Sequence, residues 1–215
     1  MATNGGSVLD PADGASDDWL ELFNPTAATV SLTGWRLSDS SPAPTEFLFP
    51  SSYSLAASGR LIAWCDNETV QSAAPASLHL PFKLSASGET LTLTAPDGTV
   101  VDTVTFGAQV TDISQGRVPD GGATIAFLLA PSAGSANTGA IAAPVATASS
   151  STPGTVSIFV NTTPGFSYQL QVKDNLTDAV WINLGAAFTA TGPSHTFTDT
   201  PTGYTRRFYR AVRTP

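Results

Sequence analysis

Short apolar runs separated by turn residues recur along the whole chain. Residues 19–23 read Trp-Leu-Glu-Leu-Phe and end at Asn24-Pro25, and the longest apolar run covers residues 59–66. Runs of this length bounded by Gly, Pro and Asn are typical of β-strands, and a run with few polar positions indicates burial on both faces. We therefore predict strands at 19–23 and 59–66, the second at the centre of a sheet.

Apolar and polar residues alternate most regularly in residues 89–95 and 100–106. Leu91 and Leu93 fall on one face of the first run, and threonines fall on the other. The two runs are joined by Pro96-Asp97-Gly98-Thr99, and Asp-Gly is a strong hairpin signal because both residues accept positive φ. The pattern predicts a β-hairpin with one buried face. Further strands in this half are predicted at 45–50 and 81–84.

A second β-pattern follows a stretch of different composition. Residues 139–153 are rich in Ala, Ser, Thr and Pro and carry no charge, which is typical of a linker. Beyond them, residues 155–161 alternate around Ile158 and Val160. The sequence therefore predicts an all-β chain with one domain at 1–138, a linker at 139–153 and a smaller domain at 154–215. Its further strands are expected at 168–172, 175–177, 181–185, 195–199 and 207–212.

The composition supports this fold class and excludes some partners. The 215 residues include 18 Gly and 16 Pro, and only 12% are charged. A net charge of −8 disfavours nucleic acid, whose binding depends largely on Lys and Arg. The apolar runs are too short for a transmembrane helix, and residues 1–16 are too polar for a signal peptide. The single cysteine, Cys65, excludes an internal disulfide framework and is expected to be a buried thiol.

Two stretches in the first half resemble the opening of bacterial lamin-tail domains. They are Asp17-Asp18-Trp19-Leu20-Glu21-Leu22-Phe23-Asn24-Pro25 and Val30-Ser31-Leu32-Thr33-Gly34-Trp35-Arg36-Leu37-Ser38-Asp39. Residues 116–122 and 131–137 are similar to the closing elements of that family. The resemblance implies an immunoglobulin-like sandwich over residues 1–138, used in exported bacterial proteins as a module beside catalytic or adhesive domains.

The second half resembles a small carboxy-terminal sandwich of exported bacterial proteins. The resemblance rests on Tyr168-x-x-Gln171, Asn175-Leu176-Thr177, Trp181 and Arg207-Phe208-Tyr209-Arg210. The fold it implies is most like fibronectin type III. We therefore expect two immunoglobulin-like β-sandwiches in tandem.

The amino terminus differs from the family pattern. Lamin-tail domains usually begin with a strand that this sequence does not show, so we expect a fragment of a longer exported protein or a product started at an internal Met of it. The neighbouring strand would then keep unpaired backbone groups, because residues 1–9 are too short and polar to cover it. An open edge of this kind favours homo-oligomers, formed either by antiparallel strand pairing or by exchange of the amino-terminal segment between two copies.

Clustered carboxylates near the amino terminus indicate a possible cation site. They are Asp10, Asp13, Asp17, Asp18 and Glu21, and hard oxygen ligands of this kind suit Ca²⁺ or another divalent cation. The spacing does not match an EF-hand. The alternative is a solvated loop whose aspartates shape turns. Residues 66–68, Asp-Asn-Glu, form a second acidic tip.

Evidence for catalysis is thin. The two histidines, His79 and His195, lie in different predicted domains, no Gly-x-Ser-x-Gly motif is present, and a zinc centre lacks ligands. We expect His79 to be a structural histidine at a surface or edge. Four aromatic rings could stack on a carbohydrate, namely Trp35, Tyr53, Trp64 and Trp181. For Trp35 and Trp181 we favour packing in the core instead.

Two functions remain open. The first is a non-catalytic extracellular module for tethering, adhesion or ligand positioning, with a protein or carbohydrate ligand. The alternative is a metal-assisted hydrolase or phosphoesterase of low or promiscuous activity. In that case Asp13, Asp17, Asp18 and Glu21 would hold a cation that polarises a phosphoryl or acyl oxygen. The sequence favours the module.

Overall fold

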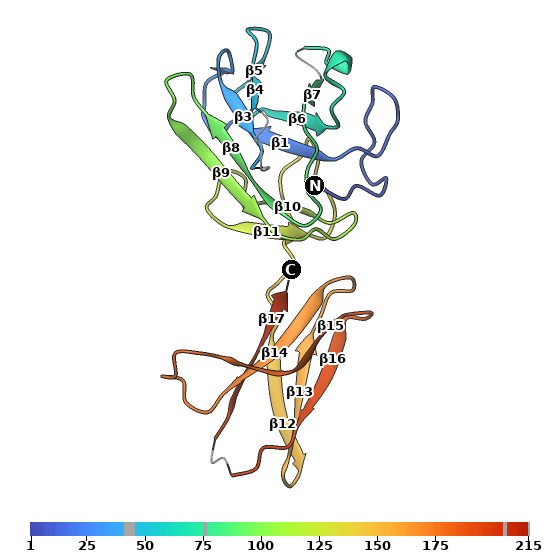
Figure 1. Cartoon of the computed structure of the whole chain (residues 1–215), viewed down its shortest axis with the longest axis vertical. Helices are drawn as coiled ribbons and strands as arrows, with labels where there is room; N and C mark the ends of the chain where they lie inside the picture. Colours follow the sequence, from blue (N-terminus) through green and yellow to red (C-terminus); the bar gives the residue numbers. More distant parts are fainter. Residues whose placement is uncertain (41–45, 75–76, 204–205, 215) are drawn as a thin grey trace. The chain divides into compact units, whose positions relative to one another are not determined.

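The chain is built almost entirely of β-strands. The computed structural model describes residues 1–40, 46–74, 77–203 and 206–214, and their regular structure is strand apart from one 3-10 turn, η1 (Thr69–Gln71). It divides into two compact units, Met1–Ile141 and Ala142–Pro215 (Figure 1). The predicted all-β fold is confirmed. No helix within the described residues is long and apolar enough to cross a membrane.

The first unit is a sandwich of two main sheets that share one core. One sheet has the order β1-β6-β7 and the other β4-β3-β8-β9, with small pairs β2-β5 and β10-β11 beside them. Buried residues from both sheets belong to the same apolar cluster, as an immunoglobulin-like sandwich requires. The strands are β1 (Trp19–Phe23), β2 (Val30–Ser31), β3 (Arg36–Ser38), β4 (Glu46–Leu48), β5 (Ser54–Leu55), β6 (Arg60–Cys65), β7 (Leu78–Leu80), β8 (Glu89–Thr94), β9 (Val100–Phe106), β10 (Ser114–Arg117) and β11 (Ile125–Leu128).

Strand β6 lies between β1 and β7, which confirms its predicted central position (Figure 1). Leu61, Ala63 and Cys65 face the main core, whereas Trp64 joins a second cluster with Trp19 on the other face. This two-sided burial explains why the run is apolar at nearly every position. The thiol of Cys65 is buried as predicted, and burial raises its pKa well above the usual value.

The predicted hairpin is present as β8 and β9, and Gly98 has a φ of 89° at its turn. Leu91 and Leu93 pack against the core as expected. The strand predicted at 81–84 is wrong, because β7 is Leu78–Leu80 and the ladder ends at Pro81, which has no backbone N–H. Part of the strand predicted at 45–50 is present as β4, and Thr45 lies outside the described residues.

The amino-terminal segment partly covers the outer edge of β1. The terminal amino group of Met1 donates to the Trp19 carbonyl, and the Trp19 N–H donates back to the Met1 carbonyl at 3.1 Å. Beyond this pair, no strand among the described residues lies beside β1 on the side away from β6. The edge is therefore covered at Trp19 and open from Glu21 to Phe23.

The second unit contains two three-stranded sheets, with orders β12-β13-β16 and β15-β14-β17. Its core cluster includes Ile158, Val160 and Leu170. Residues 146–152, predicted as linker, form β12 instead, because pairing with β13 stabilises a strand that composition alone does not indicate. Residues 175–177, predicted as a strand, lie in a turn region. The strands are β12 (Ala146–Thr152), β13 (Thr155–Asn161), β14 (Ser167–Lys173), β15 (Ile182–Thr189), β16 (Ser194–Asp199) and β17 (Phe208–Thr214).

Candidate functional site

The loop before β1 brings three of the predicted metal ligands together. One carboxylate oxygen each from Asp10, Asp13 and Asp17 lies within 4.8 Å of the others. The loop is closed by its own backbone, because the Asp10 N–H donates to the Ala15 carbonyl at 2.9 Å and the Gly14 N–H to the Asp10 carbonyl at 2.8 Å. Asp10 is buried, Asp17 is half-buried and Asp13 is exposed. The cluster therefore runs from the interior to solvent.

Two residues from the sheet lie behind this loop. Asp66 follows β6 and His79 is in β7, and His79 Nδ1 is 2.7 Å from Asp66 Oδ2 and 3.6 Å from Asp10 Oδ2. Both carboxylates and the imidazole are buried, with His79 at 0% exposure. The prediction of an edge position is confirmed, because β7 is the last strand of its sheet, whereas the prediction of a surface position is wrong. Asp10 Oδ2 itself accepts no hydrogen bond from the described residues.

Sequence reasoning placed Asp66 in a separate acidic tip and did not connect it to His79. The two residues meet because β6 and β7 pair in parallel, with Trp64 opposite His79. Parallel strands need a connection between them, so their partners are distant in the sequence. The one available signal was that an Asp ends one apolar run and a His interrupts another.

The electrostatic environment of the loop is strongly negative. Burial, followed by the charges of Asp66, Asp13 and Asp10, raises the pKa of Asp17, and only Lys83 opposes them. The pKa of Asp13 is lowered, chiefly because its carboxylate accepts the Ala15 N–H. Asp13 therefore stays ionised at neutral pH. The ionised form of Asp17 is disfavoured by burial and by the carboxylates around it.

Asp18 and Glu21, the other two predicted ligands, lie elsewhere. Burial raises the pKa of Asp18, and the amino terminus is the largest of the influences that lower it. Glu21 Oε1 is 3.5 Å from Arg60 Nε, and Glu21 Oε2 accepts the Gly134 N–H at 2.6 Å. The reason is strand geometry, since Glu21 lies in β1 rather than in the loop. The cation site expected from five residues thus reduces to three of them.

His79 also links Asp66 to a hydroxyl. Its Nε2 is 2.9 Å from Ser77 Oγ, so Ser77, His79 and Asp66 follow the hydrogen-bond order of serine hydrolases. In those enzymes the imidazole must exchange protons with the substrate. An imidazole without exposed surface cannot reach a leaving group, so this chain of hydrogen bonds favours a structural role.

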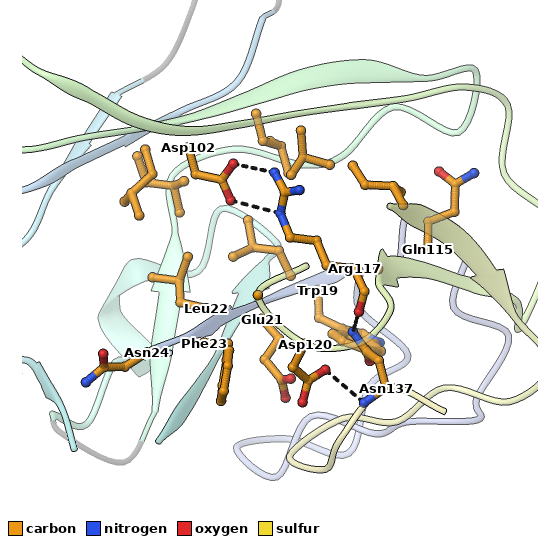
Figure 2. Close-up of a pocket in the computed structure, with 18 of the residues that line it drawn as sticks. Trp19, Glu21, Leu22, Phe23, Asn24, Asp102, Gln115, Arg117, Asp120 and Asn137 are labelled. Carbon is orange, nitrogen blue, oxygen red and sulfur yellow. Dashed lines mark hydrogen bonds and ion pairs between the residues drawn. The ribbon is translucent and has the colours of Figure 1, made fainter. Parts of the chain in front are cut away.

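A separate cavity of about 540 Å³ opens beside the outer edge of β1 (Figure 2). Leu22 points to one side of β1, and Glu21 and Phe23 point to the other. The lining includes core side chains of β8 such as Leu91 and Leu93, so the cavity is a cleft that reaches the interior of the sandwich. It extends from β1 to β9, which is the edge strand of the opposite sheet.

Paired polar groups line the mouth of this cleft. Arg117 Nε donates to Asp102 Oδ2 at 3.3 Å, and the Asn137 N–H donates to Asp120 Oδ1 at 2.9 Å. Asn137 Nδ2 also donates to the Arg117 carbonyl at 3.0 Å (Figure 2). These contacts hold β9, β10 and the following loops in place, so the cleft has an apolar floor and a polar rim.

The aromatic side chains proposed for carbohydrate contact do not form an exposed platform. Tyr53 and Trp64 are buried, and Trp35 packs against the core. Trp181 lies beneath two cations, with the Arg210 guanidinium carbon 4.5 Å and Lys173 Nζ 5.1 Å from its ring. The packing predicted for Trp35 is confirmed, and stacking on a sugar face has no support at Tyr53 or Trp64.

A protein-family model matches part of the first unit. Residues 7–108 match the family model of the Lamin Tail Domain. This lamin-tail segment contains β1 to β9 and the Asp66–His79 pair. It also contains the loop before β1 that carries Asp10, Asp13 and Asp17, called here the acidic loop. The match supports the immunoglobulin-like sandwich of the first unit and the reading of this segment as a β-sandwich module. No curated protein matches the chain.

Solved structures share only a distant likeness with the chain. A chain of a cytokine receptor complex is 12% identical, with a TM-score of 0.28, and the match covers 91% of each chain. An exo-chitosanase of Amycolatopsis orientalis, CsxA, is 13% identical, with a TM-score of 0.26 and 94% of this chain covered. The match spans 24% of the chitosanase chain. At these TM-scores neither likeness indicates a function.

Proposed function

We propose that the chain is a non-catalytic, extracellular β-sandwich module of a larger exported bacterial protein, and that it binds an extended polypeptide segment at the free edge of β1. The observation that carries this proposal is the apolar cleft beside an edge strand whose outer side is open from Glu21 to Phe23. Strand addition at such an edge combines backbone hydrogen bonds with side-chain pockets.

The backbone of β1 is suited to this pairing. In an antiparallel ladder, alternate residues direct their N–H and C=O groups to the same side. Trp19 bonds outward to Met1, so Glu21 and Phe23 also direct their backbone groups away from β6. An incoming strand would extend the pairing that Met1 begins. Its alternate side chains would enter the cleft and cover apolar surface.

We take the partner to be a second copy of the chain. Two identical edges can pair antiparallel about a twofold axis, which closes the assembly at a dimer. Each copy then satisfies the backbone groups of the other. Such a contact would tether two copies of the parent protein.

Two substitutions at Phe23 test this proposal because only one of them removes an outward backbone donor. Phe23→Pro and Phe23→Ala both lose the ring, which lies 4.6 Å from the Arg60 guanidinium carbon, but only proline also removes the N–H. Light scattering should show concentration-dependent dimers for the wild type and the alanine variant, and monomers for the proline variant. Circular dichroism checks that each variant is folded.

Two outcomes would contradict the strand-addition proposal. The first is a wild-type chain that stays monomeric over a wide concentration range. The second is a folded Phe23→Pro variant that dimerises as strongly as Phe23→Ala, because the dimer would then use another surface.

A metal-assisted hydrolase is the second candidate, and exposure of Asp13 at the acidic loop is the observation that favours it. Solvent and substrate could approach a cation from that side. The test is hydrolysis of an activated phosphodiester. Turnover that EDTA abolishes and that Asp17→Asn lacks would support this candidate, whereas equal rates with and without EDTA would exclude it.

A further inference from the structure

The acidic loop carries more negative charge than its surroundings balance. Four carboxylates meet there, those of Asp10, Asp13, Asp17 and Asp66, and the facing groups that can carry positive charge are His79 and Lys83. Lys83 is exposed, so its charge is screened by water. A buried carboxylate is costly unless it is paired or hydrogen-bonded.

Asp10 is the residue for which this cost is greatest. It is 1% exposed, and its Oδ1 accepts the Ala12 N–H at 2.9 Å. Its Oδ2 accepts no hydrogen bond from the part of the chain that the structure describes, and it lies 3.6 Å from His79 Nδ1, beyond hydrogen-bonding reach. A buried carboxylate oxygen without a donor is rare in proteins, and it indicates that something else compensates it.

His79 is not available as a ligand. Its Nδ1 is engaged with Asp66 Oδ2 at 2.7 Å and its Nε2 with Ser77 Oγ at 2.9 Å. The remaining ligand atoms are therefore carboxylate oxygens, and those of Asp13 accept hydrogen bonds from the Ala15 N–H at 2.8 Å and Gln71 Nε2 at 3.4 Å. Oxygen-only donors suit Ca²⁺ and Mg²⁺, whereas Zn²⁺ prefers nitrogen and sulfur.

We propose that Asp10, Asp13 and Asp17 bind one Ca²⁺ ion. Ca²⁺ accepts an irregular set of six to eight oxygens, which a loop with additional carbonyl groups and water can supply, whereas Mg²⁺ demands a near-ideal octahedron. Exposed Asp13 gives the ion a route from solvent, and Asp10 holds the inner side. Asp66, through its hydrogen bond to His79, supports the wall behind Asp10 and adds negative charge.

Binding would connect the loop to the sheet. Asp10 lies beside His79 of β7, which is hydrogen-bonded to Asp66 at the end of β6. An ion bound to Asp10 and Asp17 would therefore link the loop before β1 to the sheet that contains β1 and β6. An ion that binds only the folded state raises the stability of that state by mass action. The first unit should therefore become more stable with Ca²⁺, and the second unit should not change.

The test uses the full chain after removal of metal with EDTA and dialysis. Isothermal titration with CaCl₂ should give one ion per chain, and calorimetry should show a higher melting temperature for the first unit only. Asp10→Asn keeps the shape of the side chain and should weaken Ca²⁺ binding at least tenfold. The matched control is Asp97→Asn, which makes the same charge change at an exposed turn where Asp97 Oδ1 accepts the Thr99 N–H, and it should bind as the wild type does.

Several results would overturn the proposal. They are no heat and no thermal shift at millimolar Ca²⁺, equal binding by Asp10→Asn and wild type, or Zn²⁺ binding without Ca²⁺ binding. If Asp10→Asn does not fold, the half-exposed Asp17→Asn provides the same comparison. None of these measurements depends on dimerisation, so they are independent of the β1 edge.

Discussion

Replacing Ile158 with alanine should unfold the second unit at a lower temperature and leave the first unit unchanged. Ile158 has 0% exposure and belongs to a core cluster that contains only residues of the second unit. Truncating a buried isoleucine to alanine costs about 2–5 kcal/mol, because transfer free energy is lost and a cavity remains. A domain of this size loses roughly 4–8 °C per kcal/mol, so a loss of about 3 kcal/mol lowers the melting temperature by roughly 12–24 °C.

Differential scanning calorimetry of the full chain measures both units at once. The wild type should show two transitions, and Ile158→Ala should shift one of them. Leu78→Ala is the matched control, since Leu78 is also fully buried but belongs to the core of the first unit, and it should shift only the other transition. A single wild-type transition, or two transitions that move together in either variant, would refute the independence of the two cores.

Two further predictions concern a turn and a tyrosine. A Cβ at Gly88, where φ is 105°, would lie 2.5 Å from the Phe106 carbonyl oxygen, whereas a Cβ at Gly98, where φ is also positive, would have no neighbour within 4 Å. Gly88→Ala should therefore lower the free energy of unfolding by more than Gly98→Ala does. Equal losses for the two variants in urea titrations would contradict the clash. Burial, then the hydrogen bond from its hydroxyl to Asp199, raises the pKa of Tyr209 from 10.0 to about 12. Because the pKa is higher in the folded state, this stabilisation is present below pH 10 and is lost as the pH rises towards 12. The stability of Tyr209→Phe should therefore fall less between pH 10 and 12 than that of the wild type. Identical pH profiles for the two proteins would refute this prediction.

Local patterns were sufficient to predict much of the strand structure. The apolar run of β6 required burial on both faces, and the alternation of β8 and β9 around Asp97-Gly98 required a hairpin with one buried face. These features depend on neighbours within a few residues, so they can be read from the chain alone. The same holds for the turn at Asp13, because its carboxylate accepts the N–H of Ala15, two residues further along the chain.

Contacts between distant strands determined the features that local patterns did not predict. Composition indicated a linker where β12 forms, because the stability of β12 comes from its partner β13 and not from its own residues. Asp66 and His79 meet only through the parallel register of β6 and β7, and Asp10 reaches them only when the loop before β1 folds back on that sheet. The sequence by itself determined which residues are acidic and where the strands with clear apolar patterns, such as β1, β6, β8 and β9, lie. Among the described residues, the buried Asp10 oxygen accepts no hydrogen bond and one side of β1 is open. Both features depend on which strands pair, and that is set by contacts between residues far apart in the chain.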